Sequence, residues 1–289
     1  MLNKEQIAAF QSEGYLVLPR FVPKSDCSAL LDYSRALAAQ LAWEVRRMAF
    51  NPRVDDIEHE GYFLTSGDKI RVFLDPERHG AAAIPYGARE PGWQGVDKIG
   101  HALHDLDPLF DGFSRDRRLA RICDQLGMSE PLLLQSMVIF KQAHTGGEVK
   151  CHQDATWLYT EPSSVLGFWF ALEDANVDNG CMWVEPGGHR RGLLSRYRRV
   201  PDGGAKLERI GPEDDFASAD FVPLEAPAGT LIVMHGLTPH RSGPNHSPQP
   251  RGAYTLHVID GACDYPDDNW LRRPEDMPLR GFGTVAATV

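Results

Sequence analysis

The chain has 289 residues, of which 42% are hydrophobic and 24% charged, as in an ordinary globular protein. This composition excludes a collagen-like chain, a disordered tail and a small disulfide-stabilised domain. The 40 acidic residues outnumber the 30 basic ones, and the net charge of −10 argues against binding nucleic acid or an anionic membrane through the whole surface. We therefore expect no nucleic-acid partner.

No apolar run approaches the roughly 18 residues that a membrane-spanning helix requires. The first residues lack the basic stretch and apolar core of a secretory signal. The five cysteines are an odd number, are widely spaced and include no C-x-x-C pair, which is typical of reduced thiols in an intracellular protein. We expect a cytoplasmic location and no membrane span.

The first fifty residues predict helix, strand and helix. Asn3 and Gln6 have the spacing of a capping box, which predicts a short helix. The run 15–18 predicts a strand, and a longer helix is expected from Pro23 and Ser25 onward. The apolar residues of this second helix recur at helical spacing and predict one core-packing face: Leu30, Leu37, Leu41, Val45 and Met48.

The pattern then changes twice along the chain. Residues 51–95 are rich in glycine, proline and charge and predict irregular structure, and a further helix is expected over 97–106. From residue 132 onward, short apolar, β-branched and aromatic runs alternate with turn residues and predict strands. These runs cover residues 132–140, 165–172, 182–185, 230–235 and 253–260.

The order of these elements predicts the fold class. Because no helical pattern separates the strands, we expect a mainly β fold with flanking helices, either an antiparallel barrel or a double-sheet jelly roll. One domain over 1–289 fits better than two. Within it we expect a mostly helical and irregular front (1–130), a barrel core (131–262) and a C-terminal tail (263–289).

One histidine and one carboxylate have a spacing suited to metal binding. Of the eleven histidines, only His152 is followed two positions later by a carboxylate, that of Asp154. On an extended segment both side chains point to the same face, and His240, just after the apolar run 230–235, could supply a third ligand. Two imidazoles and one carboxylate form the ligand set of non-haem Fe(II) oxygenases. Such a pair also arises by chance, and a surface turn is the alternative.

Arg251 and Ser242 follow His240 closely and could bind an anion. A guanidinium can hold a carboxylate through two hydrogen bonds, and a hydroxyl can add a third. A dicarboxylate co-substrate with one end on iron would need such an anchor at its other end. The alternative for Arg251 is an ordinary surface arginine at the beginning of a strand.

Several segments, in order, resemble the phytanoyl-CoA dioxygenase family. The likeness runs from about residue 5 to Trp270. It is carried by residues 135–142 (QSMVIFKQ), 146–149 (GGEV), 152–154 (HQD), 173–175 (EDA) and 179–189 (NGCMWVEPGGH). Residues 66–71 (SGDKIR) and 98–104 (KIGHALH) resemble one subgroup of this family.

The resemblance implies a double-stranded β-helix that uses Fe(II), 2-oxoglutarate as co-substrate, and O2. It places the iron ligands at His152, Asp154 and His240, and the anchor for the distal carboxylate of 2-oxoglutarate at Arg251 and Ser242. Lys98, Met137 and Trp169 match further positions around the co-substrate, although a strand methionine or tryptophan can also be plain core. Because Asp154 is present, the resemblance implies hydroxylation with release of succinate and CO2, and disfavours halogenation.

The substrate is expected to be a small or medium organic molecule, and the sequence leaves its identity open. Five arginines between Arg190 and Arg199 could bind a phosphate-bearing substrate such as a CoA ester, or they could form a solvated loop. Residues 51–95 and 190–219 are expected to cover the active site. Two alternatives remain, which are a non-catalytic jelly roll that binds 2-oxoglutarate or another ligand, and an iron oxidase that uses no keto acid.

Overall fold

A computed structural model describes residues 1–49, 61–74, 92–212, 216 and 219–283. In this part of the chain, two antiparallel sheets face each other as a jelly roll, so the predicted fold class is confirmed. The larger sheet has the order β1 (Tyr15–Leu18), β11 (Leu231–His235), β6 (Leu166–Ala171), β13 (Arg251–Asp260), β4 (Pro131–Lys141), β3 (Val96–His101) and β2 (Ile70–Leu74). The smaller sheet has the order β10 (Val222–Leu224), β7 (Met182–Val184), β12 (His240–Ser242) and β5 (Val149–His152).

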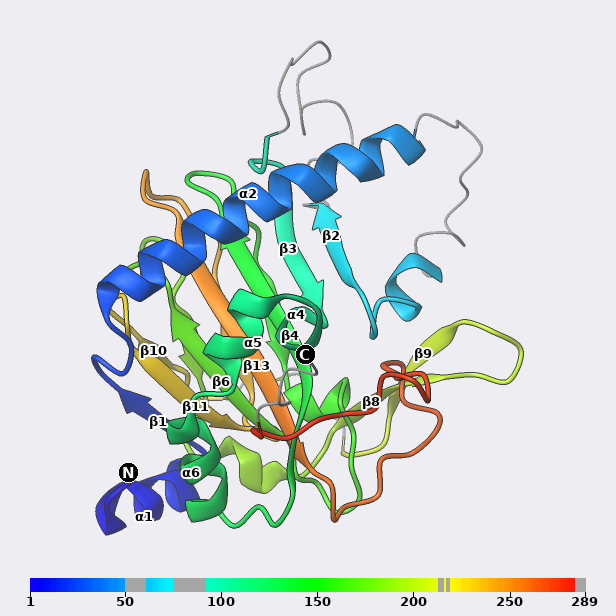
Figure 1. Ribbon diagram of the computed structural model, residues 1–289. Helices are drawn as coiled ribbons and strands as arrows, with labels where there is room; N and C mark the ends of the chain where they lie inside the picture. The colour runs from blue at the N-terminus through cyan, green and yellow to red at the C-terminus, as the bar shows by residue number, and fades with distance from the viewer. Residues whose placement is uncertain (50–60, 75–91, 213–215, 217–218, 284–289) are drawn as a thin grey trace.

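Helices cover the outer face of the larger sheet, where α2 runs across the strands (Figure 1). Apolar side chains from α2 and from the sheet form one core, which includes Leu30, Leu31, Phe170 and Tyr254. The helices are α1 (Lys4–Glu13), α2 (Lys24–Ala49), α4 (Leu103–Leu106), α5 (Pro108–Ser114) and α6 (Arg117–Gln125).

The predictions for the first helices and the strand between them are confirmed. Asn3 caps α1 through the expected capping box with Gln6. Gly14 ends the helix at φ 81°, a left-handed conformation that favours glycine. In α2, Leu30, Leu37 and Leu41 contact the core, as expected, whereas the side chains of Val45 and Met48 lie outside the described part of the structure.

The predicted helix over 97–106 is wrong. This segment forms β3, which pairs with β2 on one side and β4 on the other, and only its end forms the short helix α4. Hydrogen bonds to two neighbouring strands outweigh a local pattern that suits a helix. The predicted irregular segment 51–95 likewise contains β2, although 51–60 and 75–91 lie outside the described residues.

The strands predicted after residue 131 are confirmed as β4, β6, β7, β11 and β13. Four others were not predicted: β12 and β10, and the hairpin of β8 (Ser195–Arg199) and β9 (Ala205–Arg209). These strands have three to five residues, too few to show an alternating pattern. The extended segment expected at His152 is the end of β5, although Asp154 already lies in a 3-10 helix. The larger sheet also includes β1, β2 and β3, so it does not begin at the predicted core boundary of residue 131. None of the helices described here is both long and apolar enough to cross a membrane.

Candidate metal centre

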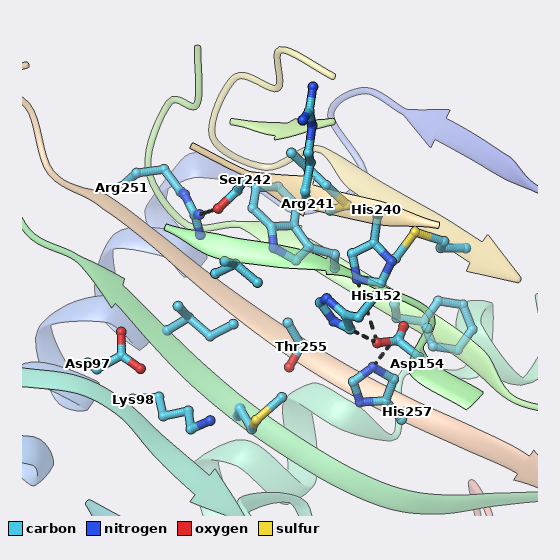
Figure 2. A pocket seen from close by; sticks show the side chains of 18 residues that line it. Asp97, Lys98, His152, Asp154, His240, Arg241, Ser242, Arg251, Thr255 and His257 are labelled. Carbon is cyan, nitrogen blue, oxygen red and sulfur yellow. Dashed lines mark hydrogen bonds and ion pairs between the residues drawn. The ribbon is translucent and has the colours of Figure 1, made fainter. Parts of the chain in front are cut away.

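His152, Asp154 and His240 meet between the two sheets (Figure 2). His152 ends β5 and pairs with His240 at the start of β12. Gln153 is extended (φ −113°, ψ 135°), so His152 and Asp154 project to the same side, and Asp154 begins the short 3-10 helix η2 (Asp154–Thr156). One donor atom from each residue lies within 4.8 Å of the others. The structure therefore brings the three predicted ligands together.

Backbone carbonyls fix the orientation of both imidazoles. Nδ1 of His152 donates to the carbonyl of Lys150 at 2.8 Å, and Nδ1 of His240 donates to that of Thr238 at 3.0 Å. Each ring therefore keeps its Nε2 lone pair for a ligand. The two Nε2 atoms lie 3.7 and 3.6 Å from Oδ1 of Asp154, separations that one ion about 2.1 Å from each donor can span.

The protonation states suit metal binding. Burial, together with His240, lowers the pKa of His152 to about 4, so the ring is neutral at pH 7. Burial raises the pKa of Asp154, but its histidine neighbours lower it more, and the net pKa lies below the ordinary value. No lysine or arginine among the described residues forms an ion pair with Asp154. The centre thus presents a carboxylate and the neutral imidazole of His152, without a lysine or arginine partner among the described residues.

A cavity of about 190 Å³ extends from this centre between the sheets. The five predicted co-substrate residues all line it: Lys98, Met137, Trp169, Ser242 and Arg251. Arg251 and Ser242 lie at the end away from His152, Asp154 and His240 (Figure 2). His240 and Ser242 of β12 both face this cavity, because residues two apart on one strand share a face.

Arg251 is a buried cation, only 3% exposed. It donates to the Gly180 carbonyl at 3.1 and 3.2 Å and to Oγ of Ser242 at 3.3 Å, and its guanidinium carbon lies 5.6 Å from the centroid of the Trp169 ring. Burial lowers the pKa of Arg251 to about 10. Among the described residues, Nη1 has no hydrogen-bond partner and no carboxylate forms an ion pair with the guanidinium. This environment suits an incoming anion.

Lys98 reaches the cavity from a strand, not from the helix that the sequence predicted. It lies in β3 opposite Ile139 of β4, and its Nζ is 5.3 Å from the centroid of the Phe73 ring. Lys98 lines both this cavity and a larger one next to it. Its ammonium group is thus available to a ligand in either cavity.

Sequence reasoning missed two polar residues of β13, Thr255 and His257. Thr255 stands opposite Met137 on one side and Trp169 on the other. Its buried Oγ1 has no hydrogen-bond partner among the described residues. Nε2 of His257 lies 3.2 Å from Oδ2 of Asp154. The alternation of side chains along this strand could have identified both residues, because positions 251, 253, 255 and 257 share the face of Arg251.

A second cavity of about 680 Å³ adjoins the first, and His152, Asp154 and His257 line both. Its walls are mainly apolar and aromatic: Phe63, Trp157, Leu158, Leu194, Leu207, Phe216 and Trp270. Phe63 comes from the segment 51–95, and Leu194, Leu207 and Phe216 come from 190–219. Both segments that were expected to cover the site therefore contribute to its wall.

The five arginines expected to form either a phosphate site or a solvated loop lie in the short helix η3 (Gly188–Arg191) and in β8. Every one contacts another part of the protein. Arg190 donates to the Ser12 carbonyl, Arg191 pairs with Glu185, Arg196 with Asp268 and Arg198 with Glu208, and Arg199 donates to the carbonyls of Leu64 and Trp270. The segment forms a short helix and a strand instead of a loop, its arginine side chains are exposed or half-buried, and a phosphate would compete with these existing partners.

Known proteins resemble this chain in sequence and in fold. Phytanoyl-CoA dioxygenase domain-containing protein 1 of Mus musculus is 39% identical over 96% of this chain and 97% of its own length. A structure of EctD from S. alaskensis with 2-oxoglutarate and 5-hydroxyectoine matches with a TM-score of 0.58 at 21% identity, covering 92% of this chain and 78% of that one. The epimerase SnoN in complex with Fe3+, alpha ketoglutarate and nogalamycin RO matches with a TM-score of 0.59 at 17% identity, covering 91% and 85%. The family model for phytanoyl-CoA dioxygenase (PhyH) matches residues 10–253, and the chain belongs to this family.

Proposed function

We propose that the protein is an Fe(II)- and 2-oxoglutarate-dependent dioxygenase that hydroxylates an organic substrate. One observation carries the proposal. A single cavity has an uncompensated buried carboxylate with two oriented imidazoles at one end and a buried guanidinium without a carboxylate partner at the other. A metal cation and a small dicarboxylate would satisfy both ends. The structures of EctD with 2-oxoglutarate and of SnoN with iron and alpha ketoglutarate support this assignment of the ligands.

In this proposal His152, Asp154 and His240 hold the iron. The hydrogen bonds from each Nδ1 to a backbone carbonyl keep both Nε2 atoms directed at the metal. Iron bound there would supply the O2 chemistry that converts 2-oxoglutarate into succinate and CO2 and oxygenates the substrate. The protein's part is to orient these groups and to exclude water from them.

Arg251 and Ser242 would bind the distal carboxylate of 2-oxoglutarate. The Gly180 carbonyl and the Trp169 ring hold the guanidinium in place, while Nη1 keeps its donor capacity for the ligand. Met137 and Trp169 would form the walls on either side of Thr255, whose hydroxyl can donate a further hydrogen bond. Lys98 would add positive charge at the junction of the two cavities.

The larger cavity is the proposed place for the substrate, because it reaches the metal ligands from another side. Its apolar and aromatic walls suit a small or medium organic molecule. A more specific proposal is that the substrate bears a phosphate group or is a CoA ester. Its anionic group would meet Lys150 and Arg209, which line this cavity, rather than the arginines between Arg190 and Arg199.

Two further expectations remain proposals. We propose that residues 1–289 act as one domain, since the co-substrate cavity draws side chains from Lys98 through His257 and from both sheets. We propose a cytoplasmic location, which is supported by five cysteines that form no disulfide.

Succinate formation tests the function and both alternatives. The protein is incubated with Fe(II), 2-oxoglutarate and O2, and succinate is measured with each component omitted in turn. We expect succinate only from the complete mixture, none from His152→Ala, and a normal yield from His246→Ala, which alters an exposed histidine outside both cavities. Oxygen consumption without 2-oxoglutarate would favour the keto-acid-independent oxidase. Binding of 2-oxoglutarate without succinate, even when a metabolite extract is added, would favour the non-catalytic protein.

A further inference from the structure

The two carboxylate oxygens of Asp154 have different partners (Figure 2). Oδ1 is the atom that lies 3.7 Å from Nε2 of His152 and 3.6 Å from Nε2 of His240. Oδ2 instead lies 3.2 Å from Nε2 of His257. One oxygen therefore belongs to the metal centre, and the other is occupied by a third histidine that the ligand set does not include.

The sheet is built to allow this contact. His257 of β13 stands directly opposite Gly167 of β6. A Cβ atom at Gly167 would lie 3.2 Å from Oδ2 of Asp154 and 3.6 Å from Cδ2 of His257. The first distance is tighter than ordinary van der Waals contact, so the carboxylate would have to shift, whereas the second is an ordinary contact. Glycine at this position leaves the space in which the two groups meet.

Packing alone does not explain His257. The residue is only 6% exposed, and its Nδ1 is buried without a hydrogen-bond partner among the described residues. An unsatisfied buried polar atom costs about 1–3 kcal/mol, so an apolar side chain would fill the same space at lower cost. The Nε2–H that His257 offers to Asp154 is what an apolar residue could not provide.

We infer that His257 is a positioning residue, which donates its Nε2–H to Oδ2 of Asp154 so that the carboxylate offers only Oδ1 to the metal. This inference rests on the proposed function. Coordination through one oxygen leaves the opposite face of the metal open for the keto acid and O2. A carboxylate free to rotate could offer both oxygens and occupy one of those positions.

Two amide substitutions separate the hydrogen bond from packing. The amide nitrogen of His257→Gln can reach about as far as Nε2, whereas that of His257→Asn is one methylene shorter. The probe is Co(II) alone, added to the metal-free full-length protein. We measure its affinity by titration and its coordination by visible absorption. We expect His257→Asn to bind Co(II) about 10–100-fold more weakly with an altered spectrum, and His257→Gln to stay within a few-fold of wild type.

The melting temperature of each metal-free variant provides the folding control. If His257→Asn does not fold, Gly167→Ala crowds the same contact from the opposite strand while keeping the imidazole, and it too should weaken Co(II) binding. Wild-type affinity and spectrum in His257→Asn would overturn the inference, as would equal losses in the two amide variants. In both cases the proposed function would stand, because only a wild-type protein that binds no Co(II) would contradict that function as well.

Discussion

Two buried aspartates of this protein each contact histidine, but they differ in the charges around them. Asp105 in α4 is paired with three arginines, at 2.8 Å from Arg115, 2.8 Å from Arg280 and 3.1 Å from Arg273. The carboxylate of Asp154 forms ion pairs only with histidines among the described residues. The negative charge of Asp105 is compensated from within the fold, and that of Asp154 is not.

This difference separates a structural cluster from a functional one. Arg273 and Arg280 come from the C-terminal segment, so Asp105 joins that segment to α4. Arg115, the residue that follows α5, is the third partner. Removing a buried charge from such a network leaves its partners unpaired. Around Asp154, no lysine or arginine of the described residues supplies a positive charge, and we propose that a bound cation does. A buried carboxylate that contacts imidazoles and has no lysine or arginine partner is thus a better signal of a metal site than a buried carboxylate as such.

The largest effects are expected from Asp154→Asn and Asp105→Asn, which should differ in metal binding and in the stability of the fold. Loss of the Asp154 carboxylate should abolish metal binding and succinate formation while changing the stability of the metal-free protein little. Loss of the Asp105 charge should destabilise the fold by about 3–5 kcal/mol, while the folded fraction still binds Co(II) normally. Denaturant unfolding and metal titration measure the two quantities. Equal loss of stability in both variants would remove the distinction between the clusters.

The same contrast predicts two windows of acid sensitivity in the metal-free protein. Burial lowers the pKa of His152 to about 4 from 6.5, so the unfolded chain binds more protons between these values and stability falls as pH drops from 6.5 to 4. The full shift corresponds to about 3 kcal/mol. The pKa of Asp105 is lowered from 3.8, because its histidine and arginine partners outweigh burial, so its contribution is lost only below about that pH.

Unfolding free energies measured from pH 7 to 3 test these windows. His152→Gln should flatten the slope between pH 6.5 and 4. His235→Gln, at a histidine outside both cavities whose pKa burial also lowers to about 4, should remove a comparable share. Asp105→Asn should not flatten that slope, because the Asp105 carboxylate raises the pKa of His104 and its loss lowers that pKa further. Some slope should remain in each histidine variant, because burial also lowers the pKa of His101 and His104. An undiminished slope between pH 6.5 and 4 in both histidine variants would contradict the assignment.

Arg251 is the cationic counterpart of Asp154, since Arg115 has two carboxylate partners and Arg251 has none among the described residues. Arg251→Gln should weaken 2-oxoglutarate binding about 10–100-fold, because charge-assisted hydrogen bonds contribute about 1.5–3 kcal/mol. Co(II) affinity should not change. Arg241→Gln is the control, because Arg241 lines the same cavity but is exposed and stacks on Phe221. Equal effects of the two variants on 2-oxoglutarate binding would argue against an anchor at Arg251.

The sequence predicts the chemistry of this site better than its surroundings. His152 and Asp154 are two residues apart, so local backbone geometry suffices to bring them together. His240, Arg251 and Ser242 are candidates from their chemistry and their place after the apolar run 230–235, and the family resemblance adds Lys98, Met137 and Trp169. Lys98 was predicted to be near the co-substrate but in a helix. Its strand depends on pairing with β2 and β4, which are distant in the chain. The Asp105 cluster was not predicted at all, because its arginines are scattered from residue 115 to 280.

Thr255 offers the smallest and most specific test. Its Oγ1 and that of Thr230 are both buried without a hydrogen-bond partner among the described residues, but only Thr255 lines the co-substrate cavity. A neutral hydrogen bond contributes about 0.5–1.5 kcal/mol, so Thr255→Val should weaken 2-oxoglutarate binding about 2–10-fold, and Thr255→Ser should retain most of the affinity. Thr230→Val should have no effect on binding. Because valine and threonine have nearly the same shape, wild-type affinity in Thr255→Val would show that the hydroxyl only packs against Met137 and Trp169. A loss confined to Thr255→Val would place a hydrogen bond to the ligand between the metal centre and Arg251.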